Sequence, residues 1–151
     1  MLEIQTRRLR PADRSLARVL FDVLAYVFDE QNGPLTDEYL DALLRQESFW
    51  AIVAMVDEQV VGGITAHALP MTRSMTSELF IYDLAVREDS RRQGVASRLV
   101  RELCAAAGSA GISEVFVPAD NDDAHALEFY RELGGEESPV TFFAFNPADI
   151  A

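Results

Sequence analysis

The apolar stretch "LFIYDLAV" at 79–86, followed by "SRRQGVA" at 90–96, is the feature that most constrains the fold. Its nearly unbroken apolar character predicts a strand covered on both faces. The run 91–110 then repeats apolar residues at the spacing of an amphipathic helix, and "ISEVFVP" at 112–118 is typical of a short strand. Because a helix that joins two strands of one sheet is a crossover, these two strands are expected to run parallel.

The rest of the chain alternates between the two periodicities. The pattern predicts strands at 2–10, 49–56, 60–69 and 139–145, and helices at 15–28, 36–44 and 122–133. A length of 151 residues suits one domain, and no repeat or linker divides the chain. The expected fold class is α+β (mixed α/β), a single domain over 1–151 with a central mixed sheet flanked by helices.

Charge and hydropathy exclude several partners. A net charge of -12 argues against binding to nucleic acid. No run approaches the roughly 20 apolar residues that cross a bilayer, so no membrane partner is expected. The opening "MLEIQTRRLR" lacks the apolar core of a signal peptide, which predicts a cytoplasmic protein. The acidic surface serves solubility or attracts a cationic small molecule or peptide.

The junction at 90–96 has the ingredients of an anion site. A helix that begins after a buried strand exposes its first backbone N–H groups and the positive end of its dipole. Gly94 lets the backbone approach an anion, Ala96 keeps the next turn small, and Arg91 and Arg92 can form bidentate contacts with phosphate. A plain helix start with solvated arginines is the alternative interpretation.

Two segments resemble signatures of the GNAT N-acetyltransferase superfamily. "YDLAVREDSRRQGVASRLV" at 82–100 is similar to its acetyl-coenzyme A motif, Leu-x-Val followed by Arg/Gln-x-x-Gly-x-Gly/Ala. "DDAHALEFYRELGG" at 122–135 is similar to the second signature, in which Asn-x-x-Ala precedes a Tyr. It departs in two places, with Asp123 in place of Asn and Gly135 in place of an aromatic residue. An Asp caps a helix as well as an Asn does, so the expected fold is unaffected.

The resemblance implies a GNAT-like domain that uses acetyl-coenzyme A as acetyl donor at the strand–loop–helix junction. The implied cofactor-binding residues are Leu84, Ala85, Val86, Arg91, Arg92, Gln93, Gly94, Val95 and Ala96. Within the superfamily, "IYDLAV", "RRQG" and "PADNDD" together most resemble the type I aminoglycoside 3-N-acetyltransferases. That likeness implies acetylation of an aminoglycoside antibiotic at its 3-amino group and a role in resistance.

Catalysis needs an acid for the leaving thiolate and a base for the amine. Tyr130 matches the family tyrosine proposed as general acid, and a core aromatic is the alternative. Asp83 interrupts an apolar strand, where a carboxylate must find a partner or accept a raised pKa, so it is the candidate base, with Glu78 as competitor. Either carboxylate can instead have a structural role. His67 and His125 lack metal-ligand spacing, so both are interpreted as structural and no metal is expected.

Carboxylates at the mouth of the site are expected to attract a polycationic acceptor. The candidate substrate-binding residues are Asp29, Glu30, Tyr82, Asp120, Asp122 and Asp123. The acceptor can equally be another cationic amine, such as a polyamine, a peptide N-terminus or a lysine side chain. A non-catalytic coenzyme A-binding module is the alternative from another class. By analogy with similar enzymes, a homodimer formed through the late strand at 139–145 is also expected.

Overall fold

The computed structural model describes residues 3–30 and 33–150, so Leu2 of the first predicted strand and Asn32 in the first interhelical loop lie outside the described residues. The chain divides into two compact units, Met1–Pro118 and Ala119–Ala151, which are described separately below as the N-terminal unit and the C-terminal unit. None of the described helices is long and apolar enough to cross a membrane.

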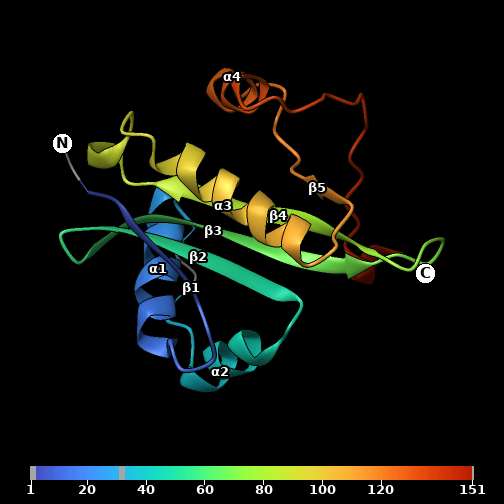
Figure 1. Ribbon diagram of the computed structural model, residues 1–151. Coiled ribbons are helices and arrows are strands. Elements are labelled where there is room, and N and C mark those ends of the chain that lie inside the picture. The colour runs from blue at the N-terminus through green and yellow to red at the C-terminus, as the bar shows by residue number, and fades with distance from the viewer. Residues whose placement is uncertain (1–2, 31–32, 151) are drawn as a thin grey trace. The chain divides into compact units, whose positions relative to one another are not determined.

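The N-terminal unit is built on a five-stranded sheet in the order β1-β2-β3-β4-β5 (Figure 1). Along the chain its elements are β1 (Gln5–Arg8), α1 (Arg14–Val27), α2 (Asp37–Arg45), β2 (Phe49–Val56), β3 (Gln59–Pro70), β4 (Ser77–Val86), a 3-10 turn (Glu88–Ser90), α3 (Val95–Ser109) and β5 (Glu114–Phe116). The first four strands pair antiparallel, and β4 pairs with β5 in parallel. The predicted mixed sheet and the parallel crossover are therefore confirmed.

Helices cover both faces of the sheet, with α1 and α2 on one side and α3 on the other (Figure 1). Leu20 of α1 packs in a cluster with Val53 of β2, and Leu99 of α3 packs in a second cluster with Ile64 and Leu79. All five side chains are fully buried, and each contributes about 1.5–3 kcal/mol relative to an exposed position. The continuous apolar runs of the central strands reflect this double coverage.

A β-bulge interrupts the pairing of β3 with β4. Thr65 lies opposite Asp83, but the next residue, Ala66, lies opposite Ile81, so Tyr82 is the extra residue. In a regular strand, Ile81 and Ala85 would share a face. Here Ile81 packs in the cluster of α3 and Ala85 in the cluster of α1. The bulge therefore changes the phase of β4 and directs two consecutive side chains, Tyr82 and Asp83, toward the α1 side.

Short-range interactions define the C-terminal unit. The helix α4 (Ala124–Glu132) is capped by Asp123, whose side chain accepts a hydrogen bond from the Ala126 N–H at 3.1 Å. Gly134 has a φ of 93°, which terminates the helix at the predicted glycine pair. The helix predicted at 122–133 is thus confirmed in a slightly shorter form.

The prediction of a strand at 139–145 is wrong. This segment forms no strand in the described structure, because a strand needs a neighbour that supplies backbone hydrogen bonds and none of the described residues pairs with it. Its apolar side chains stay exposed, with Phe142 82% and Phe143 74% accessible. A short 3-10 turn (Pro147–Asp149) follows this segment.

Candidate active site

One edge of β4 lacks a strand partner along half of its length. β5 pairs with β4 only from Glu78 to Phe80, so in the described residues the stretch 81–86 bonds to β3 alone. The N–H and C=O groups on its other edge are therefore available to a ligand. An extended molecule that carries amide groups can add to such an edge as a strand would.

The free edge of β4 leads to the N-terminus of α3. Gly94 occupies the N-cap position with a φ of 80°, which a side chain would strain, and no side chain caps the helix among the described residues. The first helical hydrogen bond runs from the Arg98 N–H to the Gly94 carbonyl, which leaves the N–H groups of Val95 and Ala96 without helical partners. The helix predicted from residue 91 begins four residues later because the left-handed Gly94 precedes it. This is the geometry of an anion site.

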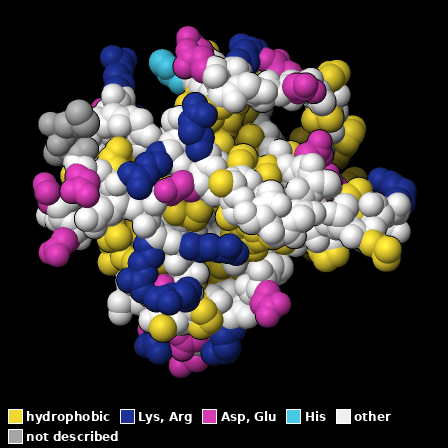
Figure 2. Space-filling view, viewed as in Figure 1, with side chains coloured by type: hydrophobic (Ala, Val, Ile, Leu, Met, Phe, Trp, Pro, Cys, Tyr) yellow, Lys and Arg dark blue, Asp and Glu magenta, His cyan; other side chains and the backbone are white. Residues whose placement is uncertain are grey.

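The arginines of the junction have different roles. The Arg91 Nε donates to the Val86 carbonyl at 3.2 Å and so ties the loop to the end of β4. Arg92 has a left-handed φ of 62° beside Gly94. Although the chain is acidic overall, positive side chains gather over the region of α3 and β1 (Figure 2). The junction therefore offers an anion both backbone donors and cationic side chains.

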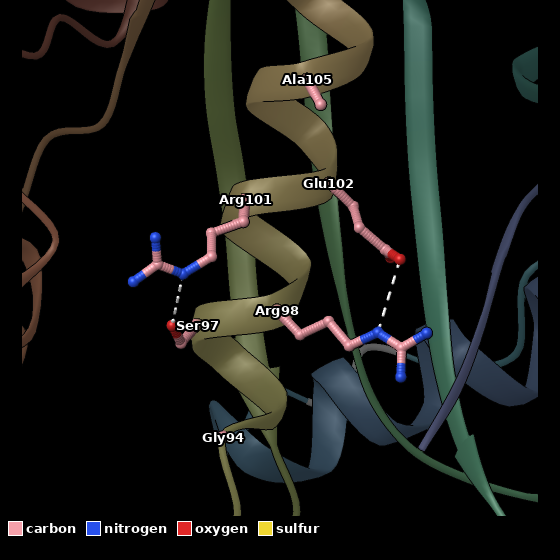
Figure 3. Close-up of a pocket in the computed structure, with 6 residues that line it drawn as sticks. All are labelled: Gly94, Ser97, Arg98, Arg101, Glu102 and Ala105. Atoms are coloured by element: carbon pink, nitrogen blue, oxygen red, sulfur yellow. Dashed lines mark hydrogen bonds and ion pairs between the residues drawn. The ribbon is translucent and has the colours of Figure 1, made fainter. Parts of the chain in front are cut away.

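A shallow depression of about 410 Å³ follows the exposed face of α3 from Gly94 to Ala105 (Figure 3). Arg101 donates to the Ser97 Oγ at 3.2 Å, and Arg98 pairs with Glu102 at 3.4 Å. The two guanidinium groups lie on opposite sides of the helix (Figure 3). Arg101, which no sequence motif singled out, adds a cation within two turns of Gly94.

A cavity of about 430 Å³ opens on the other face of the sheet, between the strands, α1 and α2. Its strand side consists of Thr65, His67, Tyr82 and Asp83. Apolar and aromatic side chains form most of the remaining wall, together with one carboxylate; they include Phe21, Leu24, Phe28, Leu35, Tyr39, Leu43, Phe49 and Glu30. No arginine lines it in the described part of the chain. The cavity is therefore suited to a cation that also has apolar surface.

Asp83 is the half-buried carboxylate of this cavity. Burial raises its pKa, and the negative charge of Glu30 raises the pKa further. A hydrogen bond from the Thr65 side chain and the neighbouring His67 act in the opposite direction. A carboxylate with a raised pKa accepts a proton more readily than an ordinary aspartate, so the environment suits a general base.

His67, interpreted from the sequence as structural, lines this cavity. Its ring lies between Phe49, at 5.3 Å between centroids, and Tyr82, at 5.7 Å. The signal for it was present in the sequence. Thr65 and His67 are polar residues two positions apart in an apolar strand, and this spacing places both side chains on one face.

Two of the predicted carboxylates in the N-terminal unit, Glu78 and Asp29, do not line the cavity. Glu78 lies opposite Leu69 and Glu114 at the start of β4, and a hydrogen bond with Glu114 raises its pKa. It is therefore not retained as a candidate base. Asp29 adopts a left-handed φ of 53° and does not line the cavity, whereas the adjacent Glu30 does.

The C-terminal unit carries the remaining predicted residues. Partial burial raises the pKa of Tyr130, and the charge of Asp123 raises it further, so the phenol stays neutral near pH 7 and can donate a proton. Asp123 caps α4, and Asp120 accepts a hydrogen bond from the Asp122 N–H at 2.9 Å. These local bonds account for Asp120 and Asp123, and the substrate role of all three aspartates stays a prediction.

A metal centre does not form among residues 3–30 and 33–150, which contain no group of three His, Cys, Asp or Glu side chains that could hold an ion. A strand edge without a partner, a glycine-led helix start and a cavity with one half-buried carboxylate are the features that the structure brings together.

Comparison with known proteins identifies the family. Residues 16–135 match the model of the Acetyltransferase (GNAT) family. The chain belongs to the GNAT acetyltransferase family. The matched segment contains the whole of α3 and α4 and the junction at Gly94. The match to this GNAT acetyltransferase therefore spans both segments that resemble the family signatures, 82–100 and 122–135.

Two solved structures of an aminoglycoside acetyltransferase from an uncultured soil metagenomic sample are similar to this GNAT protein over nearly its whole length. The complex with trehalose is 34% identical and covers 95% of this chain and 96% of its own, with a TM-score of 0.87. The complex with sisomicin is 32% identical with the same coverage and TM-score. The α+β GNAT fold with a mixed sheet is thus confirmed.

A curated human protein is also similar to this chain. Human N-acetyltransferase 8 is 31% identical over 109 residues, which are 72% of this chain and 46% of the relative. The chain therefore spans less than half the length of that relative.

Proposed function

We propose that this GNAT protein transfers the acetyl group of acetyl-coenzyme A to an amino group of an aminoglycoside, at the 3-position, and thereby confers antibiotic resistance. The observation that carries the proposal is the cavity in which Asp83 and Glu30 lie among apolar walls. Asp83 belongs to β4, the strand that has a free edge beyond β5. The similarity to an aminoglycoside acetyltransferase solved with sisomicin supports this choice of acceptor.

The residues at the junction fit acetyl-coenzyme A. The free edge at 84–86 can pair with the amides of pantetheine, and the N–H groups at the start of α3 can bind the pyrophosphate. A Cβ at Gly94 would require a strained backbone at the point where the phosphate approaches. When bound, acetyl-coenzyme A supplies a thioester as the acetyl donor.

The side chains then divide the chemistry. Asp83 binds the ammonium group of the acceptor and takes its proton, which frees the lone pair on nitrogen. The new C–N bond forms at the thioester carbonyl carbon as the C–S bond breaks. A free N–H of β4 donates to the carbonyl oxygen as charge develops on it. The resemblance to the second family signature assigns to Tyr130 the proton that the departing thiolate takes up.

Replacing Gly94 by alanine is expected to weaken coenzyme A binding about ten-fold, because the left-handed φ is unfavourable for alanine and the helix start would change its geometry. Gly108→Ala is the matched control, since Gly108 lies inside the same helix with an ordinary φ and open space around it. The control is expected to bind coenzyme A normally and to unfold at a slightly higher temperature. Calorimetric titration measures both affinities; equal values would remove Gly94 from the cofactor site.

A second candidate is acetylation of another cationic amine, such as a polyamine, a peptide N-terminus or a lysine side chain. The similarity to human N-acetyltransferase 8, whose name specifies no aminoglycoside, is the observation behind this alternative. A non-catalytic coenzyme A-binding module is the alternative without turnover. We also propose that the protein is cytoplasmic and that it forms a homodimer. The exposed side chains of Phe142 and Phe143 support the homodimer.

The deciding measurement is the release of free thiol from acetyl-coenzyme A with sisomicin, gentamicin, spermidine or a lysine peptide as acceptor. The chain contains no lysine, so acetylation of its own lysine side chains cannot contribute to the signal. We expect release that depends on the aminoglycoside, and mass and NMR analysis of the product then locates the acetylated nitrogen. Release with spermidine or the peptide alone would favour the second candidate, and binding without release would favour the module.

A further inference from the structure

A row of aromatic rings crosses the sheet on the side that faces α1 and α2. Phe21 contacts Phe49 with centroids 6.1 Å apart, Phe49 contacts His67 at 5.3 Å, and His67 contacts Tyr82 at 5.7 Å. All four rings line the cavity that contains Asp83. This ring row therefore belongs to the acceptor side of the molecule.

Tyr82 is the exposed end of the ring row. It is the extra residue of the bulge in β4, and its side chain is 64% accessible. Its ring also contacts Phe80, with centroids 5.8 Å apart, so the rings of His67 and Phe80 both pack against Tyr82. A large aromatic side chain that is positioned but uncovered presents a ready binding surface.

The ring row and the carboxylates complement one chemical class. Aromatic faces attract C–H groups that an adjacent ammonium ion makes partly positive. Asp83, which can bind that ammonium ion, follows Tyr82 directly and lines the same cavity. A rigid ring loses less conformational entropy on binding than an open chain and can lie flat on the aromatic faces. An amine attached to a saturated ring satisfies both parts of the cavity together.

We propose that Tyr82, His67 and Phe49 form a platform for the ring of the acceptor, so that the cavity selects an amine carried on a saturated ring over an amine on an open chain. Tyr82 is then a specificity-determining residue. The proposal rests on the proposed function for the reaction at Asp83, but it does not require the acceptor to be an aminoglycoside.

The first test compares cis-1,3-diaminocyclohexane with an open-chain 1,3-diamine that has the same number of carbon atoms. The two probes share amine spacing and similar apolar content and differ in rigidity and ring shape. We expect KM to be roughly ten-fold lower for the ring diamine, which corresponds to about 1.4 kcal/mol, with similar kcat values. Equal KM values would overturn the proposal.

The second test removes the ring of Tyr82. Tyr82→Ala and Tyr82→Leu are expected to raise KM for the ring diamine roughly ten-fold, to leave kcat within about two-fold, and to change KM for the open-chain diamine little. Tyr82→Phe restores the aromatic face and is expected to recover most of the lost affinity. Tyr26→Ala is the matched control, because Tyr26 is 75% exposed on α1 and does not line the cavity.

The outcomes separate the platform from the proposed function. If sisomicin is acetylated but Tyr82→Ala and Tyr26→Ala have the same KM, the platform is wrong and the function stands. If no aminoglycoside is acetylated but the ring diamine is preferred through Tyr82, the platform stands and the function is wrong. Should neither diamine be acetylated, calorimetric titration of both diamines into the wild-type and Tyr82→Ala proteins decides by the same ten-fold criterion.

Discussion

Asp83→Asn is expected to lower kcat/KM for an aminoglycoside acceptor by about 10²–10⁴-fold, the usual contribution of a positioned general base. The amide keeps the shape of the side chain but cannot take a proton from the ammonium group. The matched control is Glu78→Gln, which neutralises a carboxylate on the same strand outside the cavity and is expected to leave kcat/KM unchanged. A comparable loss in both variants would contradict the assignment.

The loss in Asp83→Asn is expected to depend on pH. Without the base, the variant relies on the small fraction of acceptor that is already a free amine, and this fraction rises with pH. The deficit is therefore largest near about pH 6 and shrinks toward about pH 9. The raised pKa of Asp83 shifts the acid limb of the wild-type profile upward from that of an ordinary aspartate. A deficit of equal size at every pH would indicate that Asp83 binds the ammonium group without taking its proton.

Stability is expected to change in the opposite direction to activity. Because the pKa of Asp83 is raised in the folded state, the folded protein holds this proton more tightly than the unfolded chain does. Stability therefore falls as the pH rises from the unfolded pKa through the folded pKa, and the penalty persists above both. Asp83→Asn removes that penalty, so its unfolding temperature at about pH 7 is expected to equal or exceed that of the wild type.

Tyr130→Phe is expected to lower kcat by about 10²-fold while the dissociation constant for coenzyme A stays within about two-fold. The ring still packs against Phe129, at 5.1 Å between centroids, but the proton for the leaving thiolate is lost. Steady-state thiol release gives kcat and calorimetric titration gives the affinity. Tyr26→Phe, an exposed tyrosine on α1, is the control. Normal turnover in a folded Tyr130→Phe variant would remove the general-acid role.

Much of the architecture was predictable because it depends on local patterns. The apolar run at 79–86 required cover on both faces, and the helix between two strands required a parallel pair; both are present. Asp123 and Gly134 act as helix cap and helix terminator, as their residue types indicated. The junction at Gly94 was also found from sequence, although the helix begins at Val95 because the left-handed glycine delays it.

The site itself was only partly predictable. Asp83 was identified because a carboxylate in an apolar strand is conspicuous, whereas His67 was interpreted as structural although it contacts Phe49 and Tyr82 in the cavity. Glu78 has the same residue type and lies on the same strand as Asp83, yet it does not line the cavity. Because of the bulge, Glu78 and Asp83 lie on the same face of β4, opposite Leu69 and Thr65, and what separates them is their position along the strand, which periodicity does not report.

By itself, the sequence determined the helices, the five strands of the sheet and the glycine-led junction, because each of these follows from the spacing of residues that are near neighbours in the chain. The tertiary structure alone decided that β5 leaves β4 after Phe80, that Tyr82 and Asp83 face the same side, and that residues 139–145 form no strand. These features depend on the hydrogen-bonding partner that each backbone group finds across the sheet. That choice is made between segments far apart in sequence, where local propensity carries no information.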